Sequence, residues 1–245
     1  EAETETESER QRDRETERQR QRQKQRQREM EQAVTKHKGN VVVVLDYGSQ
    51  YTHLITRRIR QLGVCSVCLP GTSPLPTIAS FSPSLIILSG GPHSVHEEGS
   101  PSPPHDFFDF TIANHITVLG ICYGLQLIVK LLGGSVTSAD RQEYGRMDVS
   151  PVNCSGDVDH VASRLFDDPM FCVRQSVWMS HGDEAVKLPE GFSVVCKSVQ
   201  GAIAAIENPG IGVYGLQFHP EVIYIWSVFY VPIDREVDND KSKVP

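Results

Sequence analysis

The run from Val41 to Leu45 places the strongest restriction on the fold of this chain, because four consecutive valines and a leucine leave no polar face. A strand of this kind is covered on both sides, as strands are in parallel sheets. The runs Ser84 to Leu88 and Ile116 to Ile121 have the same apolar character. The sequence therefore predicts at least three buried strands of one sheet.

Amphipathic helices are expected between these strands. Ile55, Ile59 and Leu62 follow helical spacing and form an apolar stripe, which Gly63 ends. Two more helices are expected, over Phe107 to His115 and over Tyr123 to Leu132. Shorter β-rich segments follow after about residue 140, over Val173–Met179, Phe192–Cys196, Ala202–Ile206 and Gly212–Phe218. This order predicts an α/β fold with a mostly parallel central sheet flanked by helices.

The first 36 residues have a different composition. Residues 1–32 hold 10 acidic and 9 basic side chains and no aromatic or branched aliphatic one. Such a segment cannot bury enough apolar surface to offset its chain entropy, so we expect a disordered, charged and glutamine-rich tail. We expect the folded domain over residues 40–222. Residues 223–245 read as an apolar and then acidic tail.

Composition argues against several classes of protein. The chain has 31 acidic and 24 basic residues, a net charge of −7, which does not suit a nucleic-acid-binding domain. No segment approaches the roughly 20 apolar residues of a membrane helix, and no secretory signal is evident. The six cysteines are scattered, so a reduced, cytoplasmic protein is expected. Cys65 and Cys68 form a C-x-x-C, but no second pair of cysteines and no nearby cluster of histidines completes a zinc site. No metal site is therefore predicted.

Cys122 is the first candidate for chemistry. It lies in Gly120-Ile121-Cys122-Tyr123-Gly124, between an expected strand and an expected helix, which is the pattern of a nucleophile elbow with cysteine as the nucleophile. The helix start favours negative charge and so favours the thiolate. A structural cysteine in a glycine-rich turn is the simpler alternative.

A cysteine nucleophile needs a base, and His219 is the best placed of nine histidines. It follows an expected strand, and Glu221 lies two residues on, where an extended chain would bring both side chains to one face. Cys122, His219 and Glu221 can then form a triad in which the cysteine attacks, the histidine moves protons and the carboxylate orients the histidine. His-Pro-Glu alone is a weak signal.

Four stretches together resemble the class I glutamine amidotransferases: Asp46 to Tyr51, Ser89 to Pro92, Gly120 to Gln126 and His219 to Glu221. Three stretches are most similar to the amidotransferase domain of GMP synthases within that family: Leu45 to Tyr51, Glu143 to Arg146 and Val177 to Asp183. The resemblance covers about residues 41–222. It implies a flavodoxin-like architecture and the hydrolysis of L-glutamine to glutamate and ammonia through a γ-glutamyl thioester on Cys122.

The resemblance also implies roles for further residues. Backbone N–H groups of Gly91 and Tyr123 would form the oxyanion hole. Gly90 would allow a close approach of the backbone to the substrate. Gln126, one helical turn after Cys122, would bind the substrate's α-carboxylate or amide. The family pattern places the amino-acid end of glutamine against a loop made of Ser180, His181, Gly182 and Asp183.

The resemblance implies that the ammonia serves an ATP-dependent amination of XMP to GMP. This sequence contains no glycine-rich phosphate loop, so ATP and Mg²⁺ are expected only in an ATP pyrophosphatase domain or subunit, and no cofactor in this chain. The unusual ends favour a truncated product over a separate subunit. Two other functions stay open: an inactive, regulatory amidotransferase-like subunit, and another hydrolase with a cysteine elbow.

Overall fold

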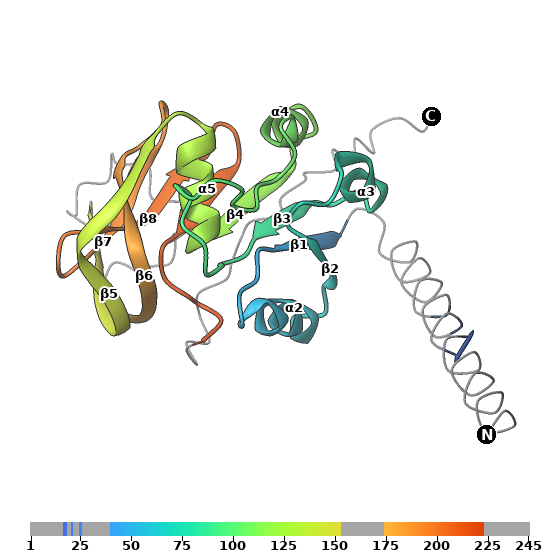
Figure 1. Ribbon diagram of the computed structural model, residues 1–245, viewed down its shortest axis with the longest axis horizontal. Helices are drawn as coiled ribbons and strands as arrows, with labels where there is room; N and C mark the ends of the chain where they lie inside the picture. The colour runs from blue at the N-terminus through green and yellow to red at the C-terminus, as the bar shows by residue number, and fades with distance from the viewer. Residues whose placement is uncertain (1–16, 19–20, 22–24, 26–39, 153–173, 223–245) are drawn as a thin grey trace, which may run out of the picture.

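One mixed sheet runs through the described chain, with its nine strands in the order β2-β1-β3-β4-β9-β8-β7-β5-β6 (Figure 1). The computed structural model describes residues 17–18, 21, 25, 40–152 and 174–222. Along the chain the elements are β1 (Val41–Asp46), α2 (Thr52–Gln61), β2 (Cys65–Pro70), α3 (Leu75–Ser80), β3 (Leu85–Leu88), α4 (Phe107–Ala113), β4 (Thr117–Ile121), α5 (Tyr123–Leu131), β5 (Ser135–Pro151), β6 (Gln175–Lys187), β7 (Ser193–Ser198), β8 (Ile203–Asn208) and β9 (Val213–Leu216).

The five strands β2, β1, β3, β4 and β9 are parallel, which confirms the predicted α/β fold. β1 lies between β2 and β3, and all of its valines are buried, as a strand covered on both faces requires. The expected helices over 107–115 and 123–132 are present as α4 and α5, a few residues shorter.

Helices cover both faces of the parallel strands. Alternate residues of β1 point to opposite faces, so Val43 packs in the core under α3, α4 and α5, and Val44 packs in the core with Ile55 of α2. Figure 1 shows α2 on the side of the sheet opposite α4. Leu62 does not complete the predicted stripe: it follows the last residue of α2 and is 68% exposed.

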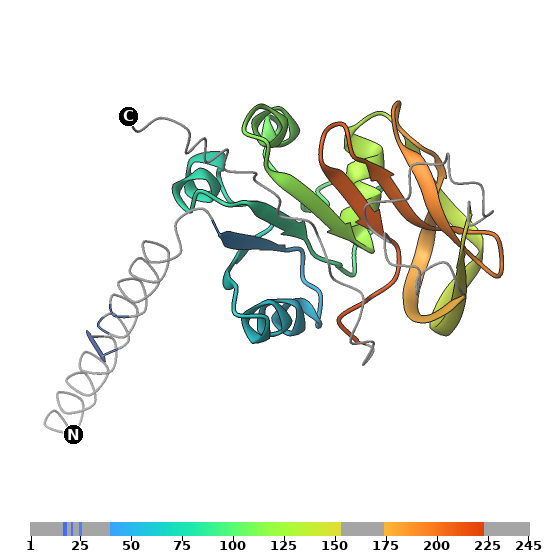
Figure 2. The same ribbon diagram turned by 180° about the vertical axis from the view of Figure 1, so that it is seen from behind.

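The antiparallel part of the sheet differs most from the expectations. β5 and β6 pair along most of their 17 and 13 residues, whereas the sequence predicted no strand over 135–151 and only a short one that ended at Met179. These strands lie with β7 and β8 at one end of the molecule, on the left in Figure 1 and on the right in Figure 2. The pairing of β5 with β6 shifts its register between Ser138 and Glu143, and this irregularity breaks the alternation of polar and apolar residues that indicates a strand.

The carboxyl ends of β1, β3, β4 and β9 meet at one edge, and the four family-like stretches follow these strands. Ligands of open α/β sheets bind at this edge. None of the helices within the described ranges is long and apolar enough to cross a bilayer. The predictions for nearly all of the 1–36 tail, for Cys154 and Cys172, and for residues 223–245 lie outside the described residues.

Candidate active site

Cys122 lies in a strained turn between β4 and α5. Its backbone has φ 54° and ψ −105°, a conformation that non-glycine residues rarely adopt. The backbone N–H of Cys122 donates to the Leu216 carbonyl at 2.7 Å, which ties the turn to β9. The sequence-predicted elbow is therefore present, and Cys122 is 4% exposed and lies at the start of α5.

His219 and Glu221 form a buried pair next to this thiol. Nδ1 of His219 lies 2.9 Å from Oε1 of Glu221, and both side chains are at most 5% exposed. The sequence predicted this contact, but the reason was wrong: β9 ends at Leu216, and residues 219–222 make a turn in which the N–H of Val222 donates to the His219 carbonyl. The turn, rather than an extended strand, brings the carboxylate to the ring.

The surroundings of His219 stabilise its protonated form. Burial alone would lower the pKa of the imidazole, but hydrogen bonds to Cys122 and Glu221, together with the charges of these groups, raise the pKa to about 10. The ring of Tyr51 packs edge-on against the imidazole, with centroids 5.3 Å apart. The geometry thus joins Cys122, His219 and Glu221 in one chain of contacts.

Glycines keep the space around the thiol open. A Cβ on Gly90 would lie 2.9 Å from Cε1 of His219 and 3.6 Å from Cβ of Cys122. A Cβ on Gly91 would lie 2.6 Å from the Tyr47 carbonyl oxygen. Both positions accept only glycine without a shift of their neighbours, so the Ser89–Pro92 turn can approach the nucleophile closely.

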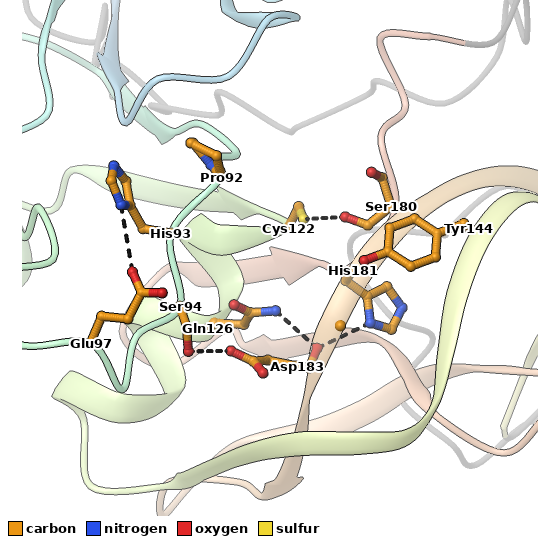
Figure 3. A pocket seen from close by; sticks show the side chains of 12 residues that line it. Pro92, His93, Ser94, Glu97, Cys122, Gln126, Tyr144, Ser180, His181 and Asp183 are labelled. Carbon is orange, nitrogen blue, oxygen red and sulfur yellow. Dashed lines mark hydrogen bonds and ion pairs between the residues drawn. The ribbon is translucent and has the colours of Figure 1, made fainter.

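A cavity of about 320 Å³ opens beside Cys122 (Figure 3). Gln126 projects into it from α5, and Nε2 of this side chain donates to the Asp183 carbonyl at 3.0 Å. The thiol contacts the Ser180 carbonyl at 3.5 Å. The other lining residues are Gly91, Pro92, His93, Ser94, Glu97, Tyr144, His181, Gly182 and Asp183.

Ser180, His181, Gly182 and Asp183 do line the cavity, but they belong to strand β6 and not to a loop as predicted. The Asp183 carboxylate accepts hydrogen bonds from Ser94 at 2.5 Å and from Ser138 at 3.2 Å. These bonds join the loop after β3, the start of β5 and β6 around the cavity. A carboxylate held in this way provides negative charge for the ammonium group of an amino acid.

A second cavity, of about 260 Å³, lies on the His219 side of the thiol. Gly91, Pro92, Cys122 and Ser180 line both cavities, and Ser49, Gln50 and Tyr51 of the turn after β1 line only the second. Cys122 therefore lies between the two cavities.

Cys65 and Cys68 are free, half-buried thiols on the edge strand β2. Burial raises the pKa of the Cys68 thiol, and the nearby Asp46 adds to this effect. Within the described residues, no group of three histidine, cysteine, aspartate or glutamate side chains has the geometry to hold a metal ion.

The family model for class I glutamine amidotransferases matches residues 43–224. This chain belongs to the class I glutamine amidotransferases. The site described above lies within the matched range, and the predicted family resemblance is confirmed.

This amidotransferase is similar to the glutamine-hydrolyzing GMP synthases of Macrococcus caseolyticus, at 44% identity over 74% of this chain and 33% of the relative, and of Chlorobaculum tepidum, at 46% over 74% and 34%. The chain thus spans about a third of the length of these curated relatives. A solved structure from Thermoplasma acidophilum, of a putative GMP synthase subunit, is 25% identical over 74% of this chain and 84% of its own, with a TM-score of 0.55. A glutamine amidotransferase of Thermotoga maritima shares the fold, with a TM-score of 0.58, 24% identity and coverage of 76% and 77%.

Sequence reasoning missed a second buried pair, made by His181 and Glu143. Nε2 of His181 lies 3.2 Å from Oε2 of Glu143, and both side chains are 1% exposed. Glu143 and His181 are opposite each other in the register of β5 and β6, but 38 residues separate them along the chain. Each of the two residues lies in a stretch that resembles the GMP synthases, but no local pattern indicated that their side chains meet, because no strand was predicted over 135–151.

Proposed function

We propose that this domain hydrolyses L-glutamine to glutamate and ammonia, with Cys122 as nucleophile, His219 as proton carrier and Glu221 as the group that orients His219. The observation that carries the proposal is the contact of a strained, cavity-lining thiol with a buried His–Glu pair. A positive φ on a buried cysteine costs about 1–3 kcal/mol, so it persists only where the surrounding structure imposes it.

Acylation requires a thiolate and a proton donor. The Cys122 thiolate attacks the side-chain amide carbon of glutamine, and a C–S bond forms. His219 then gives its proton to the departing nitrogen, the C–N bond breaks, and ammonia leaves. A histidine whose pKa is raised to about 10 carries this proton throughout the neutral range.

Deacylation uses the same histidine in the other direction. Once the sulfur is acylated, neither its hydrogen bond to His219 nor its charge raises the pKa of the imidazole any longer. The neutral imidazole then takes a proton from water, whose oxygen attacks the thioester carbon. Glutamate leaves, and the thiolate and the protonated His219 are restored.

Binding groups surround this centre. In the proposal, the backbone N–H groups of Gly91 and Tyr123 stabilise the oxyanion that forms during both steps. Gly90 leaves room for the substrate beside His219. Gln126 and the β6 residues Ser180, His181, Gly182 and Asp183 hold the amino-acid end of glutamine in the larger cavity.

The relatives favour GMP synthesis as the use of the ammonia. In this proposal an ATP pyrophosphatase, in the same polypeptide or in a partner subunit, binds ATP, Mg²⁺ and XMP and consumes the ammonia, while residues 40–222 form the amidotransferase unit and need no cofactor. The cytoplasmic location stays a prediction. Membership of this family argues against a different hydrolase with a cysteine elbow. The experiments below test the remaining alternative, an inactive regulatory subunit.

Hydroxylamine trapping tests the covalent step. Hydroxylamine competes with water for a thioester, so the chain incubated with glutamine and hydroxylamine should form γ-glutamyl hydroxamate, and Cys122→Ala should form none. Glutamate release without hydroxamate would contradict the thioester. Neither product, from a folded chain with or without the partner, would support the inactive subunit instead.

A second assay tests the destination of the ammonia. An XMP-aminating ATP pyrophosphatase mixed with this chain should form GMP from glutamine, and it should form GMP from ammonium chloride with the Cys122→Ala chain. A partner that is supplied with ATP, Mg²⁺ and XMP, yet neither accelerates glutamine hydrolysis nor forms GMP from the ammonia, is the opposite result. That result would contradict the GMP synthase assignment and leave the amidotransferase proposal intact.

A further inference from the structure

The buried pair of Glu143 and His181 has no part in the proposed triad, because Cys122 and Glu221 contact His219. Ser198 donates from Oγ to Oε1 of Glu143 at 2.6 Å, while Oε2 of the same carboxylate faces Nε2 of His181 at 3.2 Å. Burying a carboxylate costs several kcal/mol unless it is paired and hydrogen-bonded. Both oxygens of Glu143 are bonded, so the pair can hold its neighbours in fixed positions.

The hydrogen bonds of His181 define its ring orientation. Nδ1 lies 3.0 Å from the Asp183 carbonyl oxygen, which can only accept, so Nδ1 carries a hydrogen and donates. On the other side of the ring, Nε2 of His181 faces Oε2 of Glu143. The imidazole is held from both sides and cannot flip without the loss of two hydrogen bonds.

The Asp183 carbonyl connects this pair to the cavity. It accepts a second hydrogen bond from Nε2 of Gln126 at 3.0 Å, as Figure 3 shows. The amide of Gln126 is therefore oriented, with its nitrogen toward Asp183. A continuous series of hydrogen bonds runs from Ser198 through Glu143, His181 and the Asp183 carbonyl to Gln126, which lines the cavity beside Cys122.

We propose that Glu143 is a positioning residue for glutamine recognition: through His181 and the Asp183 carbonyl, it sets the orientation of the Gln126 amide toward the substrate. This inference rests on the proposed function, since it concerns the same cavity. Glu143 touches neither the thiol nor His219, so its loss weakens recognition of the amino-acid end and leaves the reactivity of the thiol unchanged.

Two reagents separate these effects in the full chain. A diazoketone analogue of glutamine carries the amino-acid end, and iodoacetamide does not, and both alkylate a cysteine nucleophile. The rate at which each modifies Cys122 is measured by peptide mass spectrometry. Glu143→Ala should slow labelling by the analogue about 10-fold or more, the effect of a buried hydrogen-bond partner, with iodoacetamide labelling within about twofold of the wild type.

Three further variants complete the test. Glu143→Gln keeps the size of the side chain and can bond both neighbours, so it should restore analogue labelling. Glu207→Ala removes another buried carboxylate, on β8, that lines neither cavity, and it should change neither rate. Glu143→Met removes the carboxylate with little change of side-chain volume and keeps His181, so it should show the same selective loss if Glu143→Ala does not fold.

The outcomes are distinct. Equal slowing of both reagents, in a folded variant, would show that Glu143 has a structural role only and would overturn the inference. Unchanged labelling by both reagents would overturn it too. A wild-type chain that iodoacetamide labels at Cys122 and the analogue does not would contradict the proposed function itself, whatever the variants do.

Discussion

Cys122, the nucleophile of the proposed mechanism, has an unfavourable backbone conformation. Its φ is 54°, it lines two cavities, and neither Gly120 nor Gly124 has room for a side chain. A Cβ on Gly120 would lie 2.5 Å from the carbonyl carbon of Gly124. The strained backbone of Cys122 and the two glycines therefore belong to the same tight turn, which places the thiol beside the cavities.

A substitution at Gly90 tests whether His219 must lie as close to Cys122 as the structure places it. Gly90→Ala puts a Cβ 2.9 Å from Cε1 of His219, so the imidazole must move, and we expect kcat/KM for glutamine hydrolysis to fall about 100-fold. Gly210→Ala is the matched control, because its Cβ would meet only the end of the Asn208 side chain, at 3.3 Å. A Gly90→Ala chain as active as the control would contradict the described position of His219.

Glu221 tests the protonation of His219. The hydrogen bond and charge of Glu221 help to raise the pKa of His219 to about 10, so activity that needs the protonated imidazole is lost as the pH rises through that value. Glu221→Gln removes the charge and lowers the pKa, and we expect the alkaline limb of the kcat/KM profile to move to lower pH.

The profile is measured from about pH 6 to pH 10.5, a window that spans the ordinary histidine pKa and the raised one. Glu190→Gln, at an exposed position, removes the same unit of charge and should leave the limb in place. An alkaline limb that Glu221→Gln does not move would show that His219 is not the titrating group.

At the scale of elements, the sequence predicted the parallel half of the sheet well because its strands are apolar on both faces. β1, β3 and β4 were found within two residues, together with α4 and α5. β5, of 17 residues, was not found, since the register of its pairing with β6 shifts between Ser138 and Glu143. A bulge breaks the alternation that indicates a strand.

The same contrast applies to the site. Cys122, His219 and Glu221 were predicted because each is marked by its local sequence. The positions of Ser180 and Asp183 on a strand depend on pairing with β5, and so does the contact of Glu143 with His181. Pairing over 38 residues is a property of the fold and leaves no signal in a single sequence.

Gly124 tests the packing of α5 on β3. A Cβ at this position would lie 2.2 Å from the Leu88 carbonyl oxygen. Helix propensity alone would make Gly124→Ala stabilising by about 1 kcal/mol, whereas the clash should lower the free energy of unfolding by about 2 kcal/mol or more. Leu131→Ala, at a half-exposed position of the same helix, should change it by less than about 1 kcal/mol, measured by urea unfolding. A more stable Gly124→Ala chain would contradict this packing.

At the scale of the described molecule, the parallel and the antiparallel parts of the one sheet contribute different residues to the candidate site. The carboxyl ends of the parallel strands carry Gly90, Cys122 and His219, and the antiparallel strand β6 supplies the wall with Asp183. In the proposed mechanism, the reactive groups and the recognition groups thus come from different parts of one sheet, joined across the cavity by hydrogen bonds of Ser94 and Gln126.

Glutamate release from glutamine, compared between the chain and Cys122→Ala, tests the central claim most directly. The assay is run with and without an XMP-aminating ATP pyrophosphatase, so that a domain that depends on its partner is not missed. We predict release that depends on Cys122 and rises when the partner is loaded. Release that survives in Cys122→Ala, or none from a folded chain under either condition, would contradict the account.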